Sequence, residues 1–192
     1  MKIFNPVPFT KINSQNYLLV ITPSEEITAS ICAFKDKAKE LIGYFHSFNS
    51  KAQITVNHYY DKKALFMEEK LTYYDQKLQQ EKPVQLKVCG FDYFEHQNTY
   101  TIYAKVDLNI EAEATFARFK KVLGSGVPNA PHITIARSLS EESFEKLWTY
   151  FEHLPFECFF YADKIVVLKT PTRRFHNALM EIETELRLKN AV

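Results

Sequence analysis

Residues 131–137 read Pro-His-Ile-Thr-Ile-Ala-Arg, a short stretch in which polar and apolar side chains alternate. Side chains at positions i and i+2 of a β-strand point to the same face of the sheet. A strand here therefore places His132 and Thr134 together on one face and turns Ile133 and Ile135 towards the core. The stretch predicts a half-buried strand that presents an imidazole and a hydroxyl side by side.

The same arrangement occurs earlier in the chain, where Gln53-Ile54-Thr55 matches His132-Ile133-Thr134. Each tripeptide lies in the second strand of an expected strand–helix–strand unit. The elements of the two units are expected at 17–22, 23–47 and 52–59, and at 99–107, 109–123 and 131–137. Two matching units about 80 residues apart indicate an internal duplication. Placed side by side about a pseudo-twofold axis, their second strands would bring the four polar side chains of the two tripeptides together.

Such a group of side chains suits a phosphate. Threonine hydroxyls donate hydrogen bonds to non-bridging oxygens, and an imidazole transfers protons near neutral pH. Taken alone, His132 is better explained as a buried histidine bonded to a backbone carbonyl, but its flanking sequence favours the functional interpretation. Arg137 is separated by an even number of residues from Ile133 and Ile135, so in a regular strand it faces the core side. It reaches the phosphate only if the strand end twists. A surface arginine is the equal alternative.

Capping signals and periodicity predict the remaining elements. Thr22-Pro23-Ser24-Glu25 has the form of a capping box and predicts the start of the first helix. Further elements are expected as a helix at 62–80, a strand at 84–88 that Gly90 interrupts, a helix from Ser140 to before Pro155, and strands at 157–161, 164–169 and 175–188. The expected fold class is α+β, with one domain over 1–192, two lobes and no linker.

Composition argues against several classes of function. A net charge of +1, from 24 basic and 23 acidic residues, does not favour a general nucleic-acid-binding surface. Four glycines argue against glycine-rich phosphate loops, and no histidine pair has metal-ligand spacing, so no metal or cofactor is expected. Three scattered cysteines are typical of reduced thiols, and no apolar run is long enough to span a membrane. We expect a cytoplasmic monomer.

The motifs resemble those of the 2H phosphoesterase superfamily, which includes the 2′-5′ RNA ligases and the cyclic phosphodiesterases. Residues 17–23 are similar to the family's first strand and helix start, 83–94 to its middle strand, and 131–137 to its second signature. The resemblance implies a bilobal fold in which two antiparallel sheets, flanked by helices, surround a V-shaped cleft. It also implies metal-independent chemistry on 2′,3′-cyclic phosphates or 2′-5′ phosphodiester bonds, with a nucleotide or RNA-end phosphate in the cleft.

The chain departs from the family pattern at Gln53, where the first signature has histidine. Glutamine forms hydrogen bonds but cannot transfer a proton near neutral pH, so the expected activity is weakened or altered. The expected substrate-binding residue is Arg137. The expected catalytic residues are His132, Thr134, Thr55 and Gln53.

His58 is a candidate to replace the missing histidine, because it follows Gln53 on the same expected strand. A separation of five residues places it on the opposite face unless a bulge intervenes. Three functions stay open: a weakened phosphodiesterase that uses His132 alone, a non-catalytic binder of nucleotide or RNA-end phosphates, and a partner-binding domain that ignores phosphate. The candidates for stacking on a base at the cleft rim are Tyr59, Tyr60, Tyr93 and Tyr103.

Overall fold

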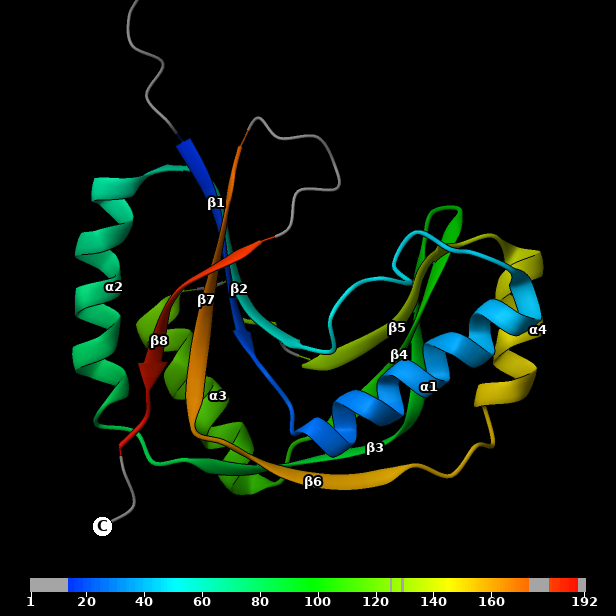
Figure 1. The fold of residues 1–192 in the computed structure, drawn as a ribbon. Coiled ribbons are helices and arrows are strands. Elements are labelled where there is room, and N and C mark those ends of the chain that lie inside the picture. Colours follow the sequence, from blue (N-terminus) through cyan, green and yellow to red (C-terminus); the bar gives the residue numbers. More distant parts are fainter. Residues whose placement is uncertain (1–13, 125, 129, 173–179, 190–192) are drawn as a thin grey trace, which may run out of the picture.

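The computed structural model describes residues 14–124, 126–128, 130–172 and 180–189 (Figure 1). Helices and strands of this part follow one another as β1 (Ser14–Ile21), α1 (Glu25–Ile42), β2 (Ile54–Lys63), α2 (Ala64–Leu78), β3 (Val84–His96), β4 (Thr99–Asp107), α3 (Ile110–Leu123), β5 (His132–Leu139), α4 (Glu141–Phe151), β6 (Glu157–Ala162), β7 (Lys164–Pro171) and β8 (Glu181–Arg187). The expected α+β class is confirmed. None of the described helices is long and apolar enough to cross a membrane.

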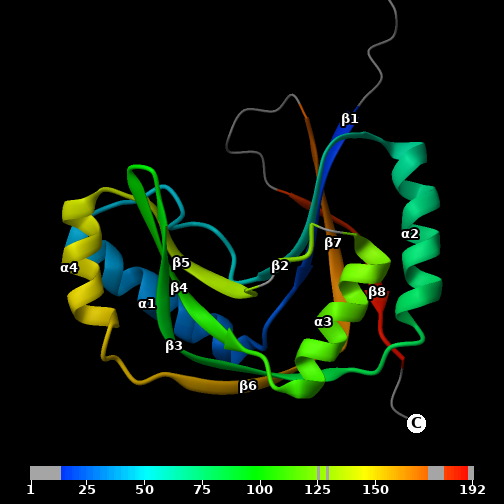
Figure 2. The same ribbon diagram turned by 180° about the vertical axis from the view of Figure 1, so that it is seen from behind.

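The strands form one antiparallel sheet in the order β6-β3-β4-β5-β2-β1-β7-β8. Its halves, β6-β3-β4-β5 and β2-β1-β7-β8, are joined where Ile54 of β2 pairs with Ile133 of β5. The expectation of two separate sheets is therefore wrong: this pairing keeps the halves in one sheet. Because the pairing is confined to this point, the halves can lean apart, as Figures 1 and 2 show.

Helices cover the two halves in pairs. Helices α1 and α4 contact each other and pack on β5, and α4 also contacts β4. Helices α2 and α3 contact each other on the opposite side of the molecule, where α2 packs on β2 and β8 (Figure 2). Helix α3 also contacts β3 of the other half, so the pair α2–α3 reaches both halves of the sheet.

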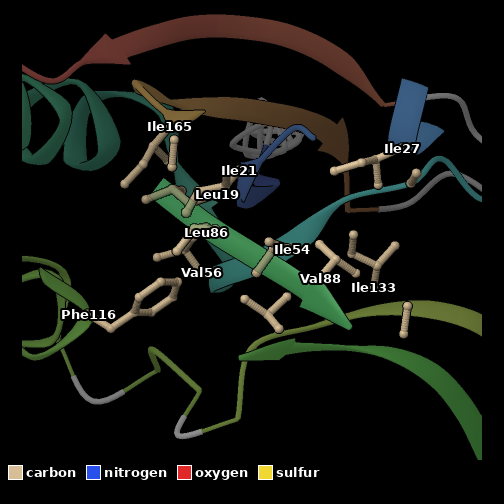
Figure 3. Packing of buried hydrophobic residues seen from close by; sticks show 14 of the residues in the cluster. Leu19, Ile21, Ile27, Ile54, Val56, Leu86, Val88, Phe116, Ile133 and Ile165 are labelled. Carbon is tan, nitrogen blue, oxygen red and sulfur yellow. The ribbon is translucent and has the colours of Figure 1, made fainter. Parts of the chain in front are cut away.

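The core confirms the alternation expected at the two tripeptides. Ile54 and Val56 of β2 and Ile133 and Ile135 of β5 are completely buried, and they belong to one apolar cluster (Figure 3). Burying a side chain of this size contributes about 1.5–3 kcal/mol. A slip of one residue would move these groups to the opposite face of the sheet. The polar neighbours of the isoleucines are consequently held on the other face.

Helix boundaries differ from expectation at α1 and agree at α3 and α4. Ser24, not Thr22, caps α1, because its Oγ accepts the Ile27 N–H at 3.4 Å. Helix α1 ends at Ile42 instead of residue 47 because Gly43, at φ +78°, takes a positive-φ conformation that glycine adopts readily and that cannot continue the helix. The side chains of Asn109 and Ser140 cap α3 and α4 as expected.

Strand β3 is longer than expected. Gly90 has φ +58° and lies where the β3–β4 register shifts between Val88 and Phe91. A β-bulge bends a strand without ending it, so β3 continues to His96. At the C-terminal end, β8 confirms a strand within 180–188, while residues 175–179 of that expected strand lie outside the described residues.

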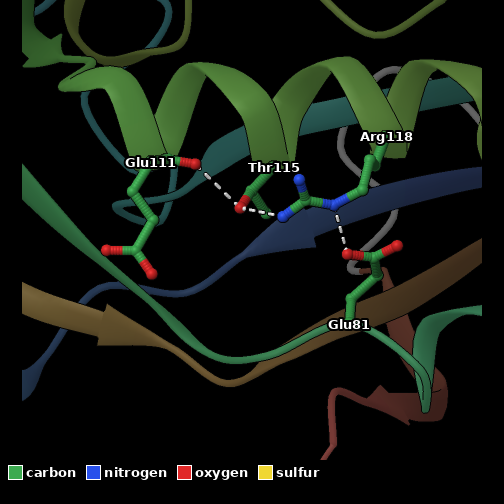
Figure 4. Close-up of polar contacts among 4 residues, drawn as sticks. All are labelled: Glu81, Glu111, Thr115 and Arg118. Carbon is green, nitrogen blue, oxygen red and sulfur yellow. Dashed lines mark hydrogen bonds and ion pairs between the residues drawn. The ribbon is translucent and has the colours of Figure 1, made fainter.

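Helix α3 is tied to the segment before β3 by an ion pair between Arg118 and Glu81 (Figure 4). The Arg118 guanidinium also donates to Thr115 Oγ1 at 2.9 Å, and this hydroxyl donates to the Glu111 carbonyl at 3.0 Å. These contacts orient α3, whose last residue, Leu123, carries a carbonyl that reaches β2.

Candidate active site

A pocket of about 240 Å³ lies at the junction of β2 and β5. It contains every residue that the sequence singled out for the site: Gln53, Thr55, His132, Thr134 and Arg137. His132 and Thr134 come from β5, Thr55 comes from β2, and Gln53 directly precedes β2. The roles of these residues stay predictions, but their side chains share one concave space. The remaining lining residues are Leu18, Ser50, Lys51, His58 and Tyr60.

The ring of His132 is held by its own loop and by two aromatic neighbours. Its Nδ1 lies 3.0 Å from the Ala130 carbonyl oxygen. A carbonyl can only accept, so this contact assigns the proton to Nδ1 and leaves Nε2 as the nitrogen that can exchange a proton with a ligand. The rings of Phe94 and Tyr103 lie 5.0 and 4.9 Å from the His132 ring, between centroids. His132 thus has the carbonyl contact of a structural histidine and still lines the pocket.

A bulge in β2 changes which residues face the pocket. In the pairing of β1 with β2, Leu19 pairs with Asn57 and the next residue, Val20, pairs with Thr55. Strand β2 therefore contains one extra residue between these pairs. The extra residue reverses the alternation of side chains beyond it. His58 consequently lines the same pocket as Thr55, although an odd separation in a regular strand would put the two side chains on opposite faces.

The buried Asn57 side chain holds this bulge. Its Oδ1 accepts the backbone N–H of His58 at 2.7 Å, and its Nδ2 donates to the Leu123 carbonyl at 2.7 Å and to the Tyr59 hydroxyl at 3.0 Å. Gly126 packs directly against the Asn57 amide: a Cβ at position 126 would lie only 2.8 Å from Asn57 Cγ and closer still to Oδ1. The bulge therefore depends on the end of α3 and on the absence of a side chain at position 126.

His58 is half-buried beside an apolar and an aromatic neighbour. Leu18 of β1 pairs with His58. The centroids of the His58 and Tyr60 rings lie 3.8 Å apart, and the rings are tilted by 34° to each other. Burial disfavours the charged imidazolium and lowers the pKa of His58 below its usual value. Near pH 7 this imidazole is therefore mainly neutral, the form that can accept a proton.

The buried Lys35, which sequence reasoning missed, fixes the loop before β2. Its ammonium donates to the carbonyls of Ser47 and Ser50 and, at 2.8 Å, to Ser50 Oγ. Burial, with a smaller contribution from Arg137, lowers the pKa of Lys35 to about 8. Ser47 Oγ in turn accepts the Arg137 N–H at 3.0 Å. The signal in the sequence was a lysine within the apolar stripe of α1, four residues after Ile31.

The candidate stacking tyrosines have different environments. Tyr60 lines the pocket and is largely exposed. Tyr59 bonds to Tyr74 and to the Leu123 carbonyl, and Tyr93 packs on aromatic residues of β4 and α4. Tyr103 is buried against His132. Among the described residues, no group of three or more His, Cys, Asp or Glu side chains is arranged to hold a metal ion.

A bent antiparallel sheet with histidine and threonine side chains in a pocket at its junction agrees with the expected 2H phosphoesterase-like class of fold. The family model of the 2′-5′ RNA ligase superfamily matches residues 52–174, and the chain belongs to this superfamily. The match includes both strands of the junction and all five residues expected in the site.

Solved structures support the same fold. The protein TT0787 of Thermus thermophilus superposes with a TM-score of 0.65 at 15% identity, over 91% of this chain and 98% of that chain. Escherichia coli LigT complexed with 3′-AMP gives a TM-score of 0.66 at 13% identity, over 92% and 99%. Usb1 of Kluyveromyces marxianus gives 0.56 at 10% identity, over 92% and 99%. No curated protein matches this sequence. Identities this low show the fold alone.

Proposed function

We propose that the pocket at the β2–β5 junction binds a terminal phosphate of a nucleotide or RNA and acts on 2′,3′-cyclic phosphates or 2′-5′ phosphodiester bonds. The observation that carries this proposal is the meeting of His132 and Thr134 with Gln53 and Thr55 around one space of about 240 Å³. The structures of E. coli LigT with phosphate and with 3′-AMP support it by fold analogy.

Each side chain has a role that suits its chemistry. The hydroxyls of Thr55 and Thr134 donate hydrogen bonds to the non-bridging oxygens of the phosphate, where negative charge gathers during the reaction. Arg137 adds a positive charge at the pocket rim. The His132 imidazole exchanges a proton through Nε2 with the attacking or leaving oxygen. Water adds to phosphorus, the bond from phosphorus to one ribose oxygen breaks, and a nucleoside monophosphate is released.

Gln53 supports a second candidate function, non-catalytic binding of nucleotide or RNA-end phosphates. Its amide can donate a hydrogen bond to a phosphate oxygen, but it cannot supply or remove a proton. A pocket with His132 as its sole proton-transfer group would retain phosphate binding and lose most of the rate that a second acid–base group contributes, about 10²–10⁴-fold.

The two functions are separated by measuring turnover and binding on the same samples. We expect the wild type to hydrolyse a 2′,3′-cyclic nucleotide and to be stabilised by nucleoside 2′- and 3′-monophosphates. A ligand at a hundredfold excess over its Kd stabilises the folded state by about 2.7 kcal/mol. His132→Ala should lose turnover, while His153→Ala, which changes an exposed histidine after α4, should behave as the wild type.

The outcomes differ clearly. Stabilisation without turnover supports the binding function instead of the catalytic one. Turnover that His132→Ala leaves unchanged would contradict the assignment of the site. A melting temperature that no nucleotide or cyclic phosphate raises at millimolar concentration, together with no turnover, would reject both functions and favour a partner-binding role.

A further inference from the structure

We propose that His58 is the second proton-transfer residue of this pocket and performs the acid–base step that Gln53 cannot perform. This inference rests on the proposed phosphoesterase function and adds a residue to it. Of the five histidines within the described residues, only His58 and His132 line the pocket.

The bulge in β2 is the feature that makes this possible. Without the extra residue between the pairs Leu19–Asn57 and Val20–Thr55, His58 would face away from Thr55. With the bulge, both side chains line the pocket. His58 comes from β2 and His132 from β5, so the two imidazoles reach the space from different halves of the sheet. Two acid–base groups that enter one pocket from different strands can serve the attacking and the leaving oxygen separately.

The contacts that hold the bulge also hold the backbone of His58 in place. Asn57 uses its Oδ1 to accept the His58 backbone N–H, and its Nδ2 binds the end of α3 through the Leu123 carbonyl. Asn57 is only 4% exposed and is not among the residues that line the pocket. We therefore assign Asn57 as a positioning residue, which acts through His58.

The surroundings of the two rings suit a division of roles. His58, kept mainly neutral by its burial beside Leu18, accepts a proton from water as the water oxygen bonds to phosphorus. His132, in its charged form, donates a proton from Nε2 to the ribose oxygen as its bond to phosphorus breaks. One proton enters His58 and one leaves His132, and exchange with solvent restores both rings. The titratable or charged groups that share the pocket with the two histidines are Lys51, Tyr60 and Arg137.

The test measures hydrolysis of a 2′,3′-cyclic nucleotide from pH 5 to pH 9. We expect a bell-shaped rate profile for the wild type, since one imidazole must be neutral and the other charged. His58→Gln should lower kcat by about 10²–10⁴-fold and remove one limb of the bell. Stabilisation by nucleoside 2′- and 3′-monophosphates should persist in this variant, which shows that the fold and the pocket are intact. His153→Gln is the matched control and should keep the wild-type profile.

A rescue experiment uses the position that the family pattern reserves for histidine. Gln53→His in the His58→Gln background should recover at least about tenfold in kcat, because it returns a second imidazole to the pocket. Asn57→Ala should lower kcat with little effect on KM and should move the limb that belongs to His58, a pattern that lost stability alone would not produce.

The inference and the proposed function fail in different ways. If His58→Gln keeps the wild-type kcat while His132→Gln abolishes turnover, His58 is not catalytic and the proposed function stands. If the wild type binds the nucleoside phosphates but shows no turnover at any pH, the inference and the catalytic function are both overturned, and the pocket is a binding site.

Discussion

Replacing Gly126 by alanine tests the packing of residue 126 on Asn57, which holds the bulge in β2. Gly126 itself lies outside the pocket. Gly126 does not adopt the left-handed conformation, so its backbone would accept alanine without strain. On its own, such a change should stabilise the protein by about 0.4–1 kcal/mol, because it lowers the entropy of the unfolded chain. The new Cβ, however, would lie 2.8 Å from Asn57 Cγ and 3.3 Å from Nδ2. The buried Asn57 side chain must then move.

The cost follows from the hydrogen bonds that Asn57 makes. Moving its amide breaks three bonds and leaves the His58 N–H without its partner, while the Leu123 carbonyl keeps a bond from the Tyr59 hydroxyl at 2.8 Å. A buried polar group left unsatisfied costs about 1–3 kcal/mol. After the entropic gain, we expect a net loss of up to about 2.6 kcal/mol.

Thermal and urea unfolding provide the assay for Gly126→Ala. In a chain of this size the loss corresponds to a decrease in Tm of up to about 10 °C, and turnover should fall because His58 is displaced. The double variant Asn57→Ala/Gly126→Ala is the control, since removing the amide relieves the collision and the two losses should not add. A Tm at or above that of the wild type, or strictly additive losses, would refute this account of the bulge.

Two further predictions concern groups outside the pocket. Because burial lowers the pKa of Lys35 to about 8 in the folded state while the usual value is 10.5, the unfolded state binds more protons between these values, and this group's contribution to stability rises with pH there. Urea unfolding at pH 7, 8 and 9 should therefore show the wild type gaining stability relative to Lys35→Met, and a constant difference would contradict the prediction. Arg118→Gln breaks the ion pair with Glu81, in which Arg118 is 43% exposed, so it should cost under about 1 kcal/mol and leave turnover unchanged. A loss above about 2 kcal/mol would contradict this prediction and show that the pair, in which Glu81 is only 17% exposed, orients α3 more strongly than a surface ion pair does.

Much of the fold could be predicted from local patterns. The alternation in residues 131–137 predicted β5 and its buried face, and the boundaries of β4 at Thr99–Asp107 agree with the expected strand. The caps Asn109 and Ser140 were likewise visible, because capping depends on a few neighbouring residues. Thr22 was a wrong choice of cap, since Ser24 offers the same chemistry two residues later.

The joining of the halves into one sheet could not be predicted from such patterns. Each strand buries its apolar residues equally well in one sheet or in two, so alternation does not distinguish these arrangements. The pairing of Ile54 with Ile133 decides the matter, and these residues are far apart in the sequence. Similarly, the sequence showed Gly90 as a possible end of β3, but only the pairing of β3 with β4 on both sides of it shows a bulge.

By itself, the sequence determined that His132, Thr134, Gln53 and Thr55 form two matching strand faces, since period-two alternation is a local property. It left the orientation of His58 undecided, because side chains alternate between the two faces of a strand only while the strand's pairing stays regular. The tertiary structure decided that orientation through Asn57 and the Leu123 carbonyl, which are 66 residues apart in the chain. A bulge is stabilised by whatever satisfies its displaced backbone groups, and here those partners come from a distant helix end that no local pattern reveals.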